Sequence, residues 1–166
     1  MSNLPEYLLD RVFDALREMV WRAWTDPELL SSWYAREETI IHKFDLKPGG
    51  LGLNEMRWRD NSDRRKIVFQ EVAPHEKLVW HHSSSDSDWS IIANPMMPDW
   101  PRVILTIVTL EHMGAKTKVR LTWEPFEATD AEIACFAGAV DNMSGGWESG
   151  YVIMDEMFVE LQAVNT

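Results

Sequence analysis

Histidines are the residues of this 166-residue chain whose side chains could exchange a proton near neutral pH. His81 and His82 are adjacent within residues 77–82, which have the composition of a strand. Neighbouring strand side chains point to opposite faces, so the two cannot share one metal ion. If Leu78 and Trp80 face a pocket, His82 faces it as well. There it could act as a general acid or base, although a polar residue in the pocket wall is the preferred interpretation.

Other chemistry-bearing residues lack the spacing that a metal or catalytic site needs. His42, His75 and His112 lie in or beside predicted turns, and we expect them to be solvated. The single cysteine, Cys135, has no neighbouring base or cation and is interpreted as a small buried hydrophobic residue. We find no Gly-rich phosphate loop, nucleophile elbow or suitably spaced carboxylate pair. The sequence therefore predicts no metal, no cofactor and no catalytic residue.

Basic residues gather at one predicted hairpin. They are Arg57, Arg59, Arg64, Arg65 and Lys66. The preferred interpretation is a solvated hairpin, balanced by Asp60 and Asp63. The alternative is a docking patch for an acidic partner.

Composition limits the class of protein. A formal net charge of −11 disfavours binding to nucleic acid. A lone cysteine forms no internal disulfide, and residues 1–10 lack the pattern of a signal peptide, so a cytoplasmic protein is expected. The longest strongly apolar run, residues 103–110, is far shorter than the ~20 residues of a membrane span. The length fits a single domain over residues 1–166.

The element that organises the chain is a long amphipathic helix over residues 142–164. Its apolar residues recur at helical spacing, and Ser144 is a candidate N-cap. Gly145, Gly146 and Gly150 within it indicate a close approach of another element or of a ligand. The apolar stripe consists of Met143, Trp147, Tyr151, Met154, Phe158 and Leu161.

The remaining elements are a strand, two short helices and a series of antiparallel strands. A strand is predicted over residues 4–13, then a helix over 15–24 capped by Asp14, and a second one that Asp26 caps and Pro27 begins. Strands are predicted over residues 39–46, 51–59, 64–73, 77–82, 102–111 and 116–124. In the last strand, Thr117, Val119, Leu121 and Trp123 share one face.

The connections between these elements carry their own signals. Pro48-Gly49-Gly50 predicts a turn in which Gly50 takes a positive φ, and residues 60–63 predict a second turn. Residues 83–101 lack either period and are interpreted as a lid or edge loop. Thr129 and Glu132 form a capping box that begins a helix ending near residue 140.

Several strings in this order resemble the family of the Hsp90-ATPase-activator C-terminal domain, in the START or Bet v 1-like helix-grip superfamily. They are Phe13-Asp14-Ala15, Val20-Trp21-Arg22-Ala23-Trp24-Thr25-Asp26-Pro27-Glu28, Asp45-Leu46-Lys47-Pro48-Gly49-Gly50, Leu78-Val79-Trp80, Val108-Thr109-Leu110-Glu111 and Gly145-Gly146-Trp147-Glu148. Residues 94–101 also resemble a signature of a bacterial subgroup. Leu16, where a proline is usual, and Gly52, where a larger residue is common, depart from the pattern.

The resemblance implies an α+β helix-grip fold, in which a curved antiparallel sheet grips the C-terminal helix around a cavity. It implies less about function, because the superfamily includes lipid carriers, hormone receptors, polyketide cyclases and self-sacrifice resistance proteins. The Hsp90 co-chaperones carry an additional N-terminal domain for which this chain has no room, which disfavours chaperone activation.

The first hypothesis is therefore a module that binds a small apolar or aromatic ligand, with His82 and Tyr151 as orienting polar groups. The alternatives are a cyclase- or hydrolase-type enzyme that uses His82, and a protein-interaction domain. Trp89 and Trp100, if exposed in the long loop, would favour a homodimer. The predicted cavity lining is Trp58, Trp80, His82, Val119, Leu121, Trp123, Trp147, Tyr151, Met154 and Phe158.

Overall fold

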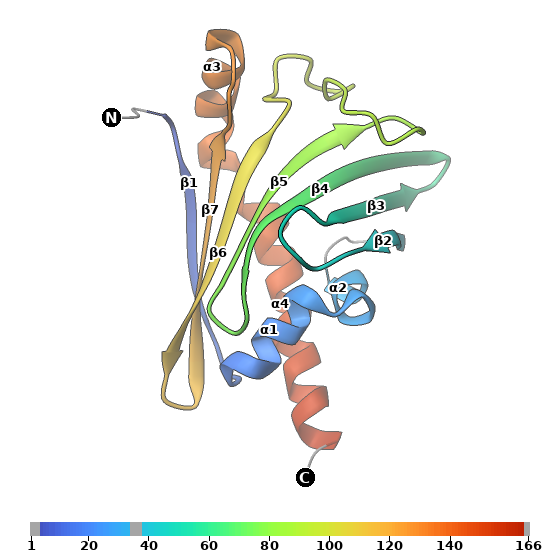
Figure 1. Ribbon diagram of the computed structural model, residues 1–166. Helices are drawn as coiled ribbons and strands as arrows, with labels where there is room; N and C mark the ends of the chain where they lie inside the picture. Colours follow the sequence, from blue (N-terminus) through green and yellow to red (C-terminus); the bar gives the residue numbers. More distant parts are fainter. Residues whose placement is uncertain (1–3, 34–37, 165–166) are drawn as a thin grey trace.

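A computed structural model of the protein describes residues 4–33 and 38–164. Seven antiparallel strands form one curved sheet in the order β1-β7-β6-β5-β4-β3-β2, and the last helix crosses its concave face (Figure 1). The strands are β1 (Tyr7–Phe13), β2 (Glu38–Phe44), β3 (Leu51–Trp58), β4 (Asn61–Ala73), β5 (Lys77–Ser85), β6 (Ile104–Met113) and β7 (Lys116–Pro125). The helices are α1 (Arg17–Thr25), α2 (Pro27–Trp33), α3 (Asp130–Ala139), the short 3-10 helix η1 (Val140–Asn142) and α4 (Ser144–Val164). The α+β helix-grip prediction is confirmed.

The two short helices begin differently. α2 starts as predicted, because Pro27 is its first residue and the Asp26 carboxylate accepts a hydrogen bond from the Glu28 N–H at 3.0 Å. α1 starts at Arg17 after Leu16, with no side-chain cap, so the predicted start at residue 15 under an Asp14 cap is wrong. Asp14 and Ala15 instead form the connection that follows β1.

Two turns differ from their predictions. The left-handed glycine after Pro48 is Gly49, with φ of 82°, and not Gly50. Gly50 is required for a different reason, since a Cβ there would lie 2.0 Å from the Asp45 carbonyl oxygen. The β3–β4 turn is shorter than residues 60–63, because Asn61 already pairs with Trp58 across the hairpin.

Strand β5 extends beyond the predicted end at His82. Ser83, Ser84 and Ser85 pair with the β4 residues 64–66 and are buried. Composition indicates a loop here, but the pairing partner in β4 overrides the weak strand preference of serine. The connection to β6 thus spans residues 86–103, and its Ile91 forms a bridge to Ser85.

The C-terminal elements follow the predicted patterns. Thr117, Val119 and Leu121 of β7 are fully buried, as their alternation predicts. Both hydrogen bonds of the Thr129–Glu132 capping box are present at the start of α3. Figure 1 shows α3 and the 86–103 connection at one end of the molecule and the C-terminal end of α4 at the other.

The core lies between the concave face and α4. The Phe13 ring of β1 meets the rings of Tyr151 and Phe158 at centroid distances of 5.1 and 5.6 Å. Trp24 of α1 and Trp33 of α2 pack edge to face at 4.7 Å, and the Trp33 indole N–H donates to the Ala23 carbonyl at 2.8 Å. Both rings also meet the Tyr151 ring at a centroid distance of 6.3 Å, which holds α1 and α2 against α4.

Candidate functional site

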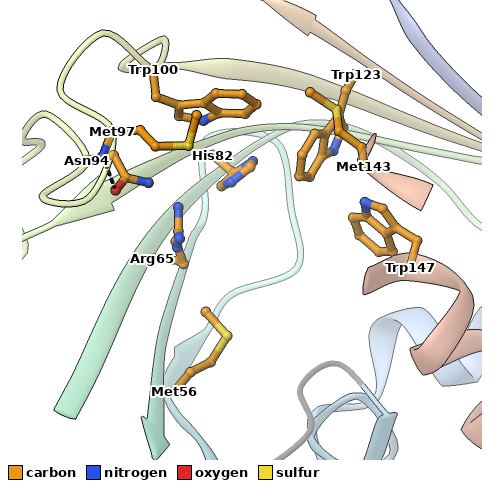
Figure 2. Close-up of a pocket in the computed structure, with 9 residues that line it drawn as sticks. All are labelled: Met56, Arg65, His82, Asn94, Met97, Trp100, Trp123, Met143 and Trp147. Atoms are coloured by element: carbon orange, nitrogen blue, oxygen red, sulfur yellow. Dashed lines mark hydrogen bonds between the residues drawn. The ribbon is translucent and has the colours of Figure 1, made fainter. Parts of the chain in front are cut away.

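A pocket of about 370 Å³ lies where the sheet, the first turns of α4 and the 86–103 connection meet (Figure 2). This volume is at the lower end of the range typical of small-molecule sites. The lining residues are Met56, Arg65, His82, Asn94, Met97, Trp100, Trp123, Met143 and Trp147.

Strand alternation places the sheet residues of the pocket on one face. Met56, Arg65, His82 and Trp123 come from β3, β4, β5 and β7, respectively, and point inward. Met143 and Trp147 lie one helical turn apart at the start of α4. The 86–103 connection closes the remaining side with Asn94, Met97 and Trp100, as Figure 2 shows.

Aromatic rings form the apolar wall of the pocket. Trp147 stacks on Trp24 at a centroid distance of 6.0 Å and meets Trp123 edge to face at 5.5 Å. Trp100 lies on Phe136 of α3 at 5.4 Å. Each of the three lining tryptophans is therefore held by another ring, which keeps the wall in place without a ligand.

The polar groups of the pocket gather at the side formed by β4, β5 and Asn94 (Figure 2). Two Arg65 nitrogens donate to one oxygen of Asp63, at 3.0 and 2.6 Å, and a third donates to the Ser84 hydroxyl at 3.2 Å. His82 is only 6% exposed. Burial lowers the pKa of its imidazole to about 3, and the nearby Arg65 charge adds to this. His82 is thus neutral at physiological pH.

The structure separates the ten residues predicted to line a cavity. His82, Trp123 and Trp147 line the pocket. Trp80 instead lines a distinct void of about 20 Å³. Trp58 ends β3, and its side chain lies outside the described part of the structure. The five others, each at most 2% exposed, belong to the packed core; they are Val119, Leu121, Tyr151, Met154 and Phe158.

The predicted lining residues fall into these groups because the pocket lies at one end of α4, whereas the apolar stripe continues along the whole length of the helix. Beyond Trp147, the stripe packs directly against the sheet. Tyr151 is fully buried, and its hydroxyl has no hydrogen-bond partner among the residues described. Burial raises the pKa of this hydroxyl well above its usual value. Tyr151 is therefore not placed to orient a ligand in this pocket.

Sequence reasoning missed Arg65 and most of the 86–103 side of the pocket. It grouped Arg65 with a solvated hairpin, although the spacing of Arg65 from the buried Ile67 and Phe69 could have indicated the inner face. Trp100 and Trp89, whose exposure would have favoured a homodimer, are both half-buried within the chain. Their exposure therefore gives no support to a homodimer.

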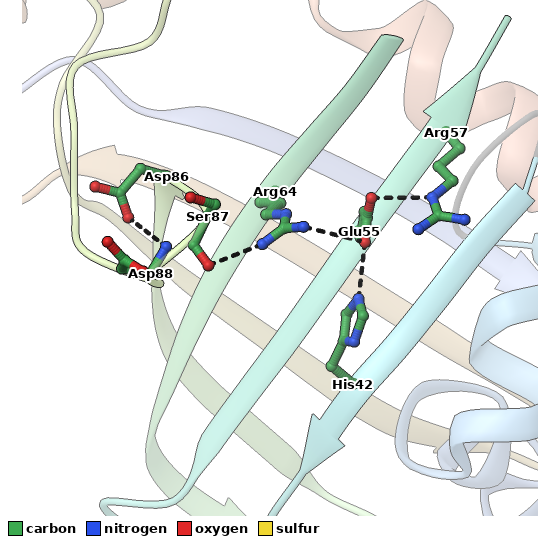
Figure 3. A network of polar contacts seen from close by, with 7 residues as sticks. All are labelled: His42, Glu55, Arg57, Arg64, Asp86, Ser87 and Asp88. Carbon is green, nitrogen blue, oxygen red and sulfur yellow. Dashed lines mark hydrogen bonds and ion pairs between the residues drawn. The ribbon is translucent and has the colours of Figure 1, made fainter. Parts of the chain in front are cut away.

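The outer face of the sheet carries a buried carboxylate (Figure 3). Glu55 is 3% exposed and accepts hydrogen bonds from Arg57 at 3.0 Å and from the ring of His42 at 2.8 Å, and Arg64 lies 3.7 Å away. Chiefly because of Arg57, and then of His42, the pKa of Glu55 is lowered to about 2. His42 lies within β2 and not beside a turn, but it is exposed, as predicted, while its ring hydrogen-bonds to this carboxylate.

This arrangement neutralises much of the basic hairpin. Arg57 and Arg64 pair with Glu55, and Arg65 pairs with Asp63 on the other face. Arg64 also donates to the Ser87 carbonyl at 2.9 Å and lies over the Trp89 ring at 5.2 Å, which ties the 86–103 connection to the sheet. The neutralised charge weakens the argument for a docking patch.

Metal sites and membrane-spanning helices are both missing from the described residues. Across residues 4–33 and 38–164, no group of three or more His, Cys, Asp or Glu side chains could hold a metal ion. No helix in the same ranges is long and apolar enough to cross a membrane.

A curved antiparallel sheet closed around a C-terminal helix, with two short helices after the first strand, defines a helix-grip protein. The chain belongs to the family of activator of Hsp90 ATPase homolog 1-like proteins, whose sequence profile matches residues 14–158. This confirms the family resemblance. None of the curated proteins matches the sequence.

Solved structures support the same fold. A crystal structure of a protein from Mycobacterium smegmatis is 18% identical, with a TM-score of 0.73 over 92% of this chain and 89% of that one. A solution structure from Arthrobacter aurescens is 19% identical, with a TM-score of 0.75 over 91% and 86%. A crystal structure from Nitrosomonas europaea is 20% identical, with a TM-score of 0.70 over 98% and 99%. Family and fold support a ligand-binding or interaction module in general.

Proposed function

We propose that this protein is a binding module for a small, flat, apolar ligand, which it holds in the pocket between the sheet and the start of α4. The observation that supports this most is the lining. Three tryptophans and three methionines surround about 370 Å³ of space, with three polar side chains at one side. Concave, mostly apolar sites with a few placed polar groups are typical of small-molecule binding.

The state of His82 favours binding over catalysis. A general acid or base is most effective when its pKa lies near the working pH. With a pKa of about 3, His82 carries no proton to donate as an imidazolium at neutral pH and is a weak base. This argues against a cyclase or hydrolase that depends on His82. The low pKa of His82 fits a neutral polar residue in the pocket wall.

A titration on a single variant tests the proposal. Flat aromatic compounds should quench the tryptophan emission of the wild-type protein saturably. Trp147→Ala should weaken their binding by roughly 1–3 kcal/mol through lost ring contact. Trp21→Ala is the control, because Trp21 is buried but packs near His75 and does not line the pocket. It should lower stability and leave affinity unchanged.

Urea denaturation of both variants separates folding from binding. If the folded wild-type protein shows no saturable quenching with a broad set of flat aromatic compounds, the binding-module proposal is wrong.

A further inference from the structure

We infer that the pocket selects flat aromatic ligands that carry a hydrogen-bond-accepting oxygen, above all a carboxylate, and that Arg65 and Asn94 receive it. This inference rests on the binding function proposed above. It names the chemical class of the ligand and the residues that determine specificity.

Arg65 is a cation held in place before any ligand arrives. Its three hydrogen bonds to Asp63 and Ser84 use three of the five N–H groups of a guanidinium, which leaves two. The side chain is 19% exposed and lines the pocket, and Figure 2 shows the guanidinium pointing toward His82. A rigid, accessible fork of this kind suits a carboxylate or carbonyl oxygen, because little side-chain entropy is lost on binding.

Asn94 presents a second donor. Its amide oxygen accepts from the backbone N–H groups of Met96 and Met97, at 2.9 and 3.3 Å. These two bonds determine which end of the amide is oxygen. The amide nitrogen is left on the other side, and in Figure 2 it is directed toward the part of the pocket where Arg65 and His82 lie.

The balance of donors and acceptors at this side determines the ligand chemistry. Arg65 and the Asn94 nitrogen can only donate, and neutral His82 offers one donor and one acceptor. A ligand oxygen placed here exchanges its hydrogen bonds to water for hydrogen bonds to these donors. The same oxygen placed against the methionines and tryptophans would lose its hydrogen bonds to water without replacement. A ligand amine would meet mostly donors, with one nitrogen of neutral His82 as the acceptor. The polar end of the ligand is therefore an acceptor, and it points toward β4.

The test uses four naphthalene probes that differ in one substituent: 2-naphthoate, 2-acetonaphthone, 2-ethylnaphthalene and 2-(aminomethyl)naphthalene. Dissociation constants are measured by equilibrium dialysis. In the wild-type protein, naphthoate should bind most tightly and the amine most weakly. Arg65→Met should weaken the binding of naphthoate roughly ten- to a hundredfold and that of acetonaphthone about two- to tenfold. It should leave ethylnaphthalene within about twofold, because that probe has no acceptor.

Lys66→Met is the matched control. It removes the same charge from the neighbouring position of β4, whose side chain points to the opposite face of the sheet. If the effect of Arg65 is local, Lys66→Met should change the dissociation constant of no probe by more than about twofold. Because Arg65→Met leaves the Asp63 carboxylate unpaired, the double variant Asp63→Asn/Arg65→Gln is measured as well. It should show the same selective loss of naphthoate.

The outcomes separate this inference from the proposed function. If no probe binds the wild-type protein, the binding function itself fails. If the probes bind, but the Arg65 variants weaken the binding of all of them equally or of none of them, the pocket does not discriminate for an acceptor and the inference is overturned. Tightest binding of the amine would overturn it too.

Discussion

Adding one methyl group at Gly150 should destabilise the protein, although alanine is the better helix former. Gly150 lies where α4 crosses α2. A Cβ there would lie 2.9 Å from the Trp33 carbonyl oxygen and 3.2 Å from the nearest carbon of its ring. Trp33 is 1% exposed and is fixed by its hydrogen bond to Ala23 and its packing against Trp24. The neighbour of the new methyl group therefore cannot move away easily.

The size of the effect follows from two opposing terms. Replacing glycine by alanine in a helix interior stabilises it by up to about 1 kcal/mol. Overpacking of a filled core costs roughly 1–3 kcal/mol. The methyl group meets backbone as well as a fixed ring, so we expect the second term to dominate, with a net loss of about 1–2 kcal/mol. Gly145→Ala, in the same helix, meets nothing within 4 Å and should be neutral or stabilising.

Urea denaturation of the two variants, followed by tryptophan emission, measures the difference. The midpoint should fall for Gly150→Ala and stay or rise for Gly145→Ala, at unchanged slope. A midpoint for Gly150→Ala at or above that of the wild-type protein would show that the contact between α2 and α4 can relax, and the reasoning would be wrong.

In urea denaturation, Gly50→Val should lower the free energy of unfolding more than Gly49→Ala does. Gly50→Val places a Cβ 2.0 Å from the Asp45 carbonyl oxygen, whereas Gly49→Ala meets only the strain of a positive φ, roughly 1 kcal/mol. The reverse order would contradict the geometry of this turn. His82 should contribute a loss of folding stability of up to about 1.4 kcal/mol per pH unit as pH falls from 6.5 toward 3, because the unfolded chain protonates His82 and the folded one does not. His82→Gln should flatten this slope in urea melts between pH 7 and 4, and an unchanged slope would refute a buried neutral imidazole. Glu55→Gln should be destabilised at pH 7, and its deficit should narrow as pH falls from about 4.5 toward 2, where the wild-type carboxylate protonates. A deficit that is constant down to pH 3 would show that ionisation of Glu55 contributes little.

Local signals in the sequence determined the elements and the fold. The start of α2 at Asp26-Pro27 and the Thr129–Glu132 capping box depend only on hydrogen bonds within a few residues. The inward face of β7 follows from strict alternation, and the resemblance to the family rests on an ordered set of local strings. The local signal was weak for the serines that end β5, and the prediction failed there because their partners in β4, distant in the chain, decided the outcome.

Only the tertiary structure decided what surrounds the pocket. A helical stripe shows which side of α4 is covered, but not where along the helix the sheet stops touching it, and so it could not separate Trp147 in the pocket wall from Tyr151 in the core. The strand pattern does not show that Arg65 and the start of α4 line the same pocket, nor that residues 86–103 return to close it with Asn94. These placements depend on sheet curvature and on contacts between residues far apart in the sequence, and neither is written in the spacing of neighbouring residues.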